Sequence, residues 1–177
     1  MIVVVAGVAG SGKTTVGQLL AERLGWIFAD GDAFHPDANV AKMRAGLPLT
    51  DADREPWLSA ICSWMDDVIS SGQSAVLACS ALKRRYRDEL LAGRPQAEMV
   101  FLIISRAEDE ARLTTRTSHF FHEPLLASQY ADLELPGPGE RVHKITVARR
   151  PAGQVAAEAM KVLGLVPADG QSGLGSR

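Results

Sequence analysis

The chain has 177 residues, the size of one domain, and its 46% hydrophobic and 23% charged residues are typical of globular proteins and argue against disorder. A formal net charge of −2 gives no general attraction to nucleic acid or to an anionic membrane, and no apolar stretch approaches the roughly twenty residues that cross a bilayer. Cys62 and Cys79 are too few and too far apart for a disulfide framework or a zinc site. No basic leader precedes the first strand, so we expect a cytoplasmic protein.

The first predicted strand, residues 2–6, and the first predicted helix, residues 15–24, flank a complete phosphate-binding pattern G-x-x-x-x-G-K-[ST]. The matching residues are Gly7, Val8, Ala9, Gly10, Ser11, Gly12, Lys13 and Thr14, with Thr15 next in line to contact the nucleotide. Glycines let the backbone N–H groups point at phosphate oxygens. Lys13 is expected to reach the β- and γ-phosphates and to act in catalysis, and the Thr14 hydroxyl to bind Mg²⁺. The alternative is an unrelated glycine-rich turn, but the flanking strand and helix favour a site for a nucleoside triphosphate.

Strands and helices alternate along the rest of the chain. Further strands are predicted at residues 26–29, 75–79, 99–104 and, more weakly, 145–147. Further helices are predicted at residues 36–45, from the capping box at Thr50 to Gly72, and at 83–91, 107–116 and 151–163. The pattern predicts a single α/β domain, residues 1–165, with a parallel sheet flanked by helices on both faces. Residues 166–177 are rich in Gly and Ser and are predicted to form a flexible tail.

Magnesium needs a second acidic anchor near the phosphate loop. The third and fourth strands end in Cys79-Ser80 and Ile104-Ser105, whereas the second ends in Asp30, with Asp32 two residues later. In an extended run these carboxylates would point opposite ways, so Asp30 could bind the metal and Asp32 could act as the base that accepts a hydroxyl proton. The alternative for Asp-Gly-Asp is a polar turn that caps the next helix.

Several longer motifs resemble the gluconate kinases of the small P-loop type. They read D-G-D-A-F-H-P (residues 30–36), N-V-A-K-M (39–43), G-L-P-L-T-D-A-D-R (46–54), C-S-A-L-K-R-R-Y-R-D (79–88), H-F-F (119–121), L-L-A-S-Q (125–129) and L-E-L-P (133–136). The resemblance covers nearly the whole chain. It implies ATP-dependent phosphorylation of D-gluconate at the 6-hydroxyl, a five-stranded parallel sheet of the shikimate kinase type and, often, a homodimer.

A pocket for gluconate, a flexible polyol with one carboxylate, should offer hydrogen-bonding side chains and a cation. The candidates are His35, Lys42, Arg54, Lys83 and Arg87. For Arg54 a local ion pair is an equal alternative, and for His35 a structural turn. Lys83 and Arg87 share one helical face, which suggests an inward pair, and the basic cluster around them lacks the aromatic residues of a nucleic-acid surface.

Residues 112–123 are predicted to form a mobile lid that closes over ATP. By the resemblance, Arg112 is a phosphate contact with a catalytic role, Arg116 lies at the adenine side and His119 contacts the substrate. His119 and His122 lack a third ligand nearby for a metal site. Thr117-Ser118 replaces the Lys-Gly expected in the family, and residues 147–149 lack the acidic residues that relatives often carry.

Two other functions compete with gluconate phosphorylation. The first is another small-molecule kinase of this fold, which would act on shikimate, a different sugar acid or a nucleoside monophosphate. The second is a nucleotide switch or sensor, against which stand the missing Asp-x-x-Gly and Asn-Lys-x-Asp tetrapeptides of GTPases and the paired carboxylates beside the γ-phosphate.

Overall fold

Five strands form one parallel sheet in the computed structural model, which describes residues 1–115 and 123–168, without the side chains of 112–115 and 123–124. The strands are β1 (Ile2–Ala6), β2 (Ile27–Asp30), β3 (Ala75–Ala78), β4 (Ala97–Ile103) and β5 (Val142–Thr146). They lie in the order β2-β3-β1-β4-β5, and all four pairings are parallel. The predicted fold class is therefore confirmed.

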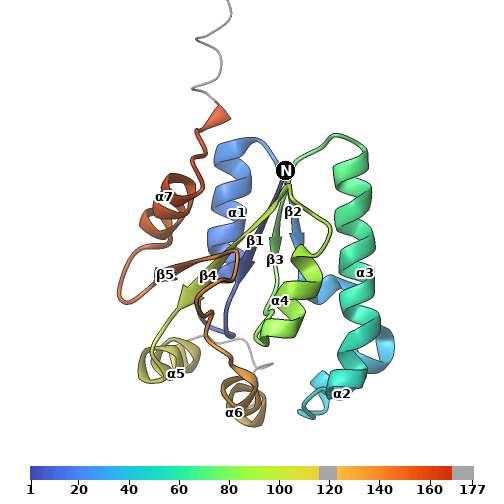
Figure 1. Ribbon diagram of the computed structural model, residues 1–177. Coiled ribbons are helices and arrows are strands. Elements are labelled where there is room, and N and C mark those ends of the chain that lie inside the picture. Colours follow the sequence, from blue (N-terminus) through green and yellow to red (C-terminus); the bar gives the residue numbers. More distant parts are fainter. Residues whose placement is uncertain (116–122, 169–177) are drawn as a thin grey trace, which may run out of the picture.

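Helices cover both faces of this sheet (Figure 1). They are α1 (Lys13–Leu24), the 3-10 helix η1 (Gly31–Phe34), α2 (Asp37–Arg44), α3 (Asp51–Ser70), α4 (Arg84–Leu91), α5 (Arg106–Thr115), α6 (Glu123–Asp132) and α7 (Ala152–Val162). The capping box predicted at the start of α3 is present, with the Asp53 N–H donating to Thr50 Oγ1 at 3.2 Å and the Thr50 N–H to Asp53 Oδ2 at 2.8 Å. None of the described helices is long and apolar enough to cross a bilayer.

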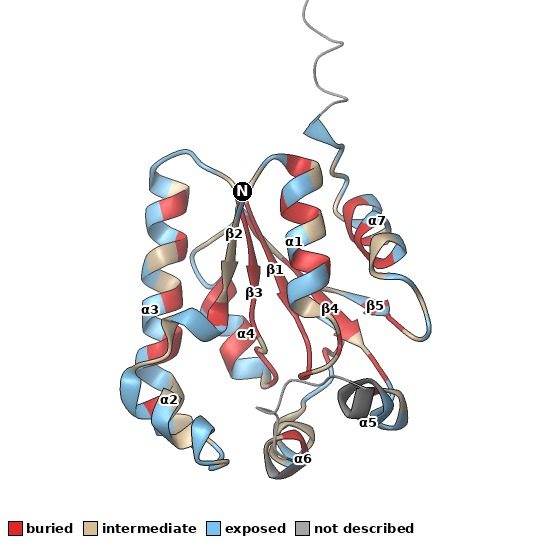
Figure 2. Cartoon of the chain, turned by 180° about the vertical axis from the view of Figure 1, so that it is seen from behind, coloured by how far each residue is buried: buried red, intermediate tan, exposed pale blue. Residues whose placement is uncertain are grey.

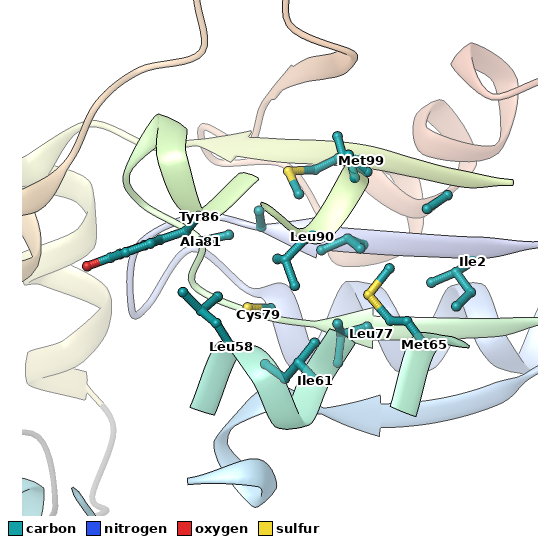
Figure 3. Close-up of a cluster of buried hydrophobic side chains, with 14 of the residues drawn as sticks. Ile2, Leu58, Ile61, Met65, Leu77, Cys79, Ala81, Tyr86, Leu90 and Met99 are labelled. Atoms are coloured by element: carbon teal, nitrogen blue, oxygen red, sulfur yellow. The ribbon is translucent and has the colours of Figure 1, made fainter. Parts of the chain in front are cut away.

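Two hydrophobic cores lie on opposite faces of the sheet. In β1, Ile2 and Val4 pack with α3 and α4, whereas Val3 and Val5 pack with α1 and α7. This alternation is that of a strand buried on both sides. Figure 2 shows that the buried residues of the helices face the sheet. In the close-up of the first core, Tyr86 lies at one end, with its hydroxyl directed away from the apolar cluster (Figure 3).

The structure differs from the predicted elements in three places. η1 and α6 were not predicted, and β5 begins at Val142 rather than at residue 145. The first half of β5 is only partly buried, so hydrophobicity does not mark it; its pairing with β4, from Met99 opposite Val142 onward, defines the strand. The predicted tail falls mostly beyond residue 168, where the described residues end.

The carboxyl ends of the strands gather the segments that carry polar motifs. β1 leads into the phosphate loop, β2 into η1 and β3 into residues 79–83, while α2, α5 and α6 lie beyond these ends (Figure 1). β1 lies between β3 and β4. The chain therefore places β2 and β3 on one side of β1 and then crosses to place β4 and β5 on the other side. Such a switch point is where open parallel sheets bind ligands.

Candidate active site

The loop between β1 and α1 has the backbone shape of a phosphate-binding loop. Gly7, Gly10 and Gly12 have positive φ angles of 139°, 80° and 95°. A β-carbon at Gly7 would lie 2.8 Å from the Leu102 carbonyl oxygen, so space as well as conformation requires glycine there. Gly12 directly precedes α1, so the free N–H groups of the first helical turn face the loop and favour an anion.

Lys13, the first residue of α1, is held at this loop. Its Nζ donates to the Val8 carbonyl oxygen at 2.9 Å. Burial lowers the pKa of Lys13, while the carboxylates of Asp32 and Asp30 oppose that shift. An ammonium group between the loop and two carboxylates is suited to neutralise charge on a transferring phosphoryl group.

Thr14 and Asp30, the two residues predicted to hold the metal, are brought together by the fold. Thr14 Oγ1 donates to Asp30 Oδ2 at 3.0 Å. These oxygens fit Mg²⁺, which binds one or two protein groups and completes its octahedron with water and phosphate oxygens. Among the described residues, no group of three or more His, Cys, Asp or Glu side chains could hold a metal ion alone. A magnesium site here would therefore depend on phosphate oxygens.

Asp32 does not continue the extended run that the sequence predicted. After Asp30 the chain turns into η1, and Asp30 Oδ1 accepts the Asp32 N–H at 3.1 Å. Trp57 fixes this turn, because its Nε1 donates to the Gly31 carbonyl at 2.7 Å. The two aspartates separate as expected, with Asp30 on Thr14 and Asp32 in the adjacent pocket, but a helical turn separates them rather than strand alternation.

The surroundings of Asp32 suit a general base. Burial raises the pKa of its carboxyl group, the nearby charge of Asp30 raises it further, and Lys13 lowers it. A base is most effective when its pKa approaches the working pH. Desolvation of its carboxyl group therefore makes Asp32 more basic than a fully solvated aspartate.

One pocket joins the phosphate loop to the segments that follow β2 and β3. Ala9 and Lys13 line it from the loop, and Asp32 and His35 from the β2 side. The α2–α3 region and residues 80–86 supply further wall residues: Met43, Pro48, Leu49, Arg54, Trp57, Ser80, Leu82 and Tyr86. From α6 come Leu125, Ser128, Gln129 and Asp132, at the i, i+3, i+4, i+7 spacing of one helical face. A phosphate group bound at the loop and a second ligand bound at the facing wall can thus meet in one pocket.

His35 combines the two roles that the sequence left open. Its ring stacks on Trp57, with centroids 4.7 Å apart and planes at 9°, and it lines the pocket. Burial, together with the charge of Arg54, lowers the pKa of His35 to about 4. The imidazole is therefore neutral near pH 7, so it can offer a hydrogen bond but no charge to an acceptor.

Arg54 reaches the pocket from a group of charged side chains on α3, on α6 and at the start of α4. We call this group the acceptor cluster: Asp51, Arg54, Lys83, Arg85 and Asp132. The Arg54 guanidinium lies 2.9 Å from Asp132 and 3.7 Å from Asp51. Lys83 pairs with the same two carboxylates at 3.1 and 2.7 Å, and Arg85 lies 2.8 Å from Asp51. Three cations share two carboxylates, so the acceptor cluster has a net positive charge. Arg54 lines the pocket and Lys83 does not, which makes Arg54 the better candidate to meet an anionic ligand.

Lys42 does not line the pocket, although the sequence predicted that it binds substrate. Its Nζ pairs with Asp53 Oδ1 at 2.6 Å. Asp53 belongs to the capping box of α3, and its hydrogen bonds with Lys42 and Thr50 lower its pKa to about 2. Lys42 thus ties α2 to the start of α3, a contact that sequence spacing does not reveal.

Arg87 is a structural residue, which corrects its prediction as a substrate contact. Its side chain is 1% exposed, and its Nε and Nη2 lie 2.7 and 3.2 Å from the carboxylate oxygens of Glu140. Its Nη1 donates to the carbonyl oxygens of residues 81, 82 and 134. Arg87 follows Lys83 by one helical turn, as predicted, but its side chain contacts residues 134–140 instead of lining the pocket.

The predicted lid, residues 112–123, falls largely outside the described part of the chain. Arg116 and His119 lie outside it, as do Thr117 and Ser118, and the side chain of Arg112 is not described, although its backbone belongs to α5. Their predicted contacts with nucleotide, phosphate and substrate therefore stay predictions.

Among the pocket residues that were not predicted to have a role there are Trp57, Tyr86, Gln129 and Asp132. Trp57 was assigned to the core face of its helix, and it is buried as expected, yet it also shapes η1. Residues 125, 128, 129 and 132 have helical spacing in the sequence. That spacing was the signal that could have identified α6 and its polar face.

Comparisons with known proteins are consistent with this site. Residues 9–144 match the family model described as shikimate kinase. A gluconokinase from Gluconobacter oxydans is 49% identical over 148 residues, which cover 84% of this chain and 83% of the relative. Among solved structures, a sugar kinase from Janibacter has a TM-score of 0.87 at 42% identity and covers 94% of this chain and 96% of its own. A gluconokinase structure from Sinorhizobium meliloti has a TM-score of 0.81 at 42% identity, with 92% and 90% covered.

Proposed function

The chain belongs to the gluconokinases of the shikimate kinase family, and from this membership we propose that it transfers the γ-phosphoryl group of ATP to the 6-hydroxyl of D-gluconate. The observation that carries the proposal is the single pocket shared by Lys13, Asp32 and Arg54. Lys13 belongs to the phosphate loop, Asp32 has the surroundings of a base, and Arg54 offers a cation to an acidic acceptor.

The proposed base is Asp32. Its carboxylate accepts the proton of the 6-hydroxyl while the new oxygen–phosphorus bond forms and the bond from the γ-phosphorus to the bridging oxygen breaks. The products are 6-phosphogluconate and ADP. The raised pKa of Asp32 supports this assignment, because a more basic carboxylate takes a hydroxyl proton more readily.

The donor side would be formed by residues 7–15. The amides of the loop and the Lys13 ammonium would bind the phosphates, as their position at the start of α1 favours. Thr14 and Asp30 would hold Mg²⁺, which when bound neutralises charge on the β- and γ-phosphates. We include Arg112 and Arg116 among the nucleotide contacts and His119 among the substrate contacts as parts of the same proposal.

The acceptor would lie with its acid end at Arg54. A guanidinium can hold a carboxylate through two parallel bonds, and the net positive charge of the acceptor cluster favours one more anion. The neutral His35 would meet a hydroxyl group. An acidic polyol placed in this way has its far end free to meet Asp32, which also lines the pocket.

An ADP-release assay tests the proposal over gluconate, other sugar acids, neutral polyols, shikimate and nucleoside monophosphates. Turnover is expected to be fastest with gluconate, and phosphorus NMR of the product should show the phosphate on the 6-oxygen. Turnover of another acceptor with none on gluconate would contradict the proposed substrate. The proposed homodimer is tested separately by light scattering, where a monomeric mass would contradict it.

A further inference from the structure

Gln129 of α6 connects the phosphate loop to the acceptor pocket. Its Oε1 accepts the Ala9 N–H at 2.6 Å, across 120 positions of sequence. The N–H of Gly7 in the same loop donates instead to the Ser80 backbone carbonyl. A side chain from α6 thus holds an amide of the donor loop.

The bond to Ala9 also fixes which way the carboxamide of Gln129 lies. A backbone N–H can only donate, so the side-chain atom that faces Ala9 is the oxygen. Among the described residues, none accepts a hydrogen bond from the Gln129 Nε2. Gln129 lines the pocket together with Lys13 and Asp32, so the two N–H groups of its Nε2 can donate to a ligand there.

We propose that Gln129 is a specificity-determining residue, whose Nε2 donates to an acceptor hydroxyl neighbouring the one that is phosphorylated. The inference rests on the proposed function, because it takes the acceptor to be a polyhydroxy acid. The anchored carboxamide holds the acceptor at a fixed place relative to the phosphate loop. The carboxamide also favours acceptors that carry a hydroxyl group next to Nε2, because without that hydroxyl the Gln129 Nε2 has no hydrogen-bond partner in the complex.

The same face of α6 also lies beside the site proposed for the acid end of the acceptor. Asp132 lies three residues beyond Gln129 and pairs with Arg54 at 2.9 Å. Gln129 therefore stands near the transferred group and Asp132 beside the cation proposed for the acid end. One rigid element, α6, sets the distance between the two.

The γ-phosphate is the other oxygen-bearing ligand near this loop, and two variants distinguish it from an acceptor hydroxyl. Gln129→Leu removes both polar atoms, whereas Gln129→Glu keeps an oxygen for the Ala9 N–H, loses the donors and adds a negative charge beside the phosphate loop. A control is Gln18→Leu, an exposed position on α1. Initial rates are measured with gluconate and with each monodeoxygluconate, at varied ATP, alongside thermal unfolding.

Gln129→Leu is expected to lower kcat/KM for gluconate roughly tenfold, with KM for ATP changed less than about twofold. The loss should nearly disappear with the one monodeoxygluconate that lacks the contacted hydroxyl, because the interaction is already absent there. Gln129→Glu should reproduce the loss on gluconate with an unchanged unfolding midpoint, and Gln18→Leu should match the wild type.

Two results would overturn the inference. One is an equal loss on every deoxy acceptor, which a purely structural role predicts. The other is a rise in KM for ATP of the uncharged variant Gln129→Leu that exceeds its effect on gluconate, which would place the donors on the γ-phosphate. A wild-type enzyme that does not use gluconate contradicts the proposed function instead, and the same comparison can then be made with the acceptor that it does use.

Discussion

Replacing Arg87 by alanine is expected to destabilise the protein strongly without removing a substrate contact. The side chains of Arg87 and Glu140 are 1% and 4% exposed, and two hydrogen bonds of 2.7 and 3.2 Å join them. The substitution leaves the Glu140 carboxylate buried without its cation and removes the donor to three backbone carbonyls. Truncating one partner of such a pair costs about 3–5 kcal/mol.

That free energy corresponds to a large shift of the unfolding midpoint. A domain of this size moves by about 2–4 °C per kcal/mol, so Arg87→Ala should lower Tm by about 6–20 °C. Arg84→Ala on the same helix is the matched control. Its 3.5 Å pair with Asp88 joins side chains that are 56% and 61% exposed, and such a pair contributes only about 0.3–0.5 kcal/mol.

Differential scanning calorimetry gives the two midpoints, and steady-state kinetics below them gives KM for gluconate. We expect a large midpoint shift for Arg87→Ala, a shift within about 2 °C for Arg84→Ala, and KM for gluconate within a few-fold of wild type in both. A strongly raised KM with an unchanged midpoint for Arg87→Ala would refute the structural role and restore the substrate contact first predicted.

Three further predictions concern the proposed chemistry. Asp32→Asn should lower kcat on the order of a hundredfold or more while calorimetric ATP affinity stays within a few-fold, and near-normal kcat would remove Asp32 as base. Lys13→Ala should lower kcat more than it raises KM for ATP, and an unchanged kcat would contradict its place at the transferring group. In wild type, log kcat/KM should fall as pH decreases, with a midpoint above 3.8, because the pKa of Asp32 is raised and only its ionised form accepts a proton. Persistence of this limb in Asp32→Asn would assign it to another group.

The donor half of the site could be predicted because its residues are adjacent in sequence. The loop from Gly7 to Thr14 needs only a strand before it, a helix after it and glycines where φ is positive, all of which are local properties. The contact of Asp30 with Thr14 was also predictable, because Asp30 ends β2. This strand pairs with β3, which in turn pairs with β1, the strand that leads into the loop.

The acceptor half depended on contacts between distant segments. The 3-10 turn at Asp32 is set by Trp57, a residue 26 positions away from Gly31, to whose carbonyl it donates. Lys83 and Arg87 are one helical turn apart, and neither lines the pocket, because Lys83 pairs with Asp51 and Arg87 packs against residues 134–140. These partners are distant in sequence. The polar face of α6 was present in the sequence, but its partner Ala9 is 120 positions away.

The stacking of Trp57 on His35 gives the pocket an optical reporter. Trp57 is 1% exposed, and its indole has His35 against one face and Gly31 at its nitrogen, so a change at the acceptor site alters the surroundings of the chromophore directly. Since the pKa of His35 is about 4, the stacked imidazole stays uncharged between roughly pH 6 and 8, and its titration adds no change to the emission there. In a variant whose other two tryptophans, Trp26 and Trp64, are replaced by phenylalanine, stopped-flow fluorescence could therefore time the arrival of the acceptor separately from phosphoryl transfer, with no coupling enzyme and no added dye.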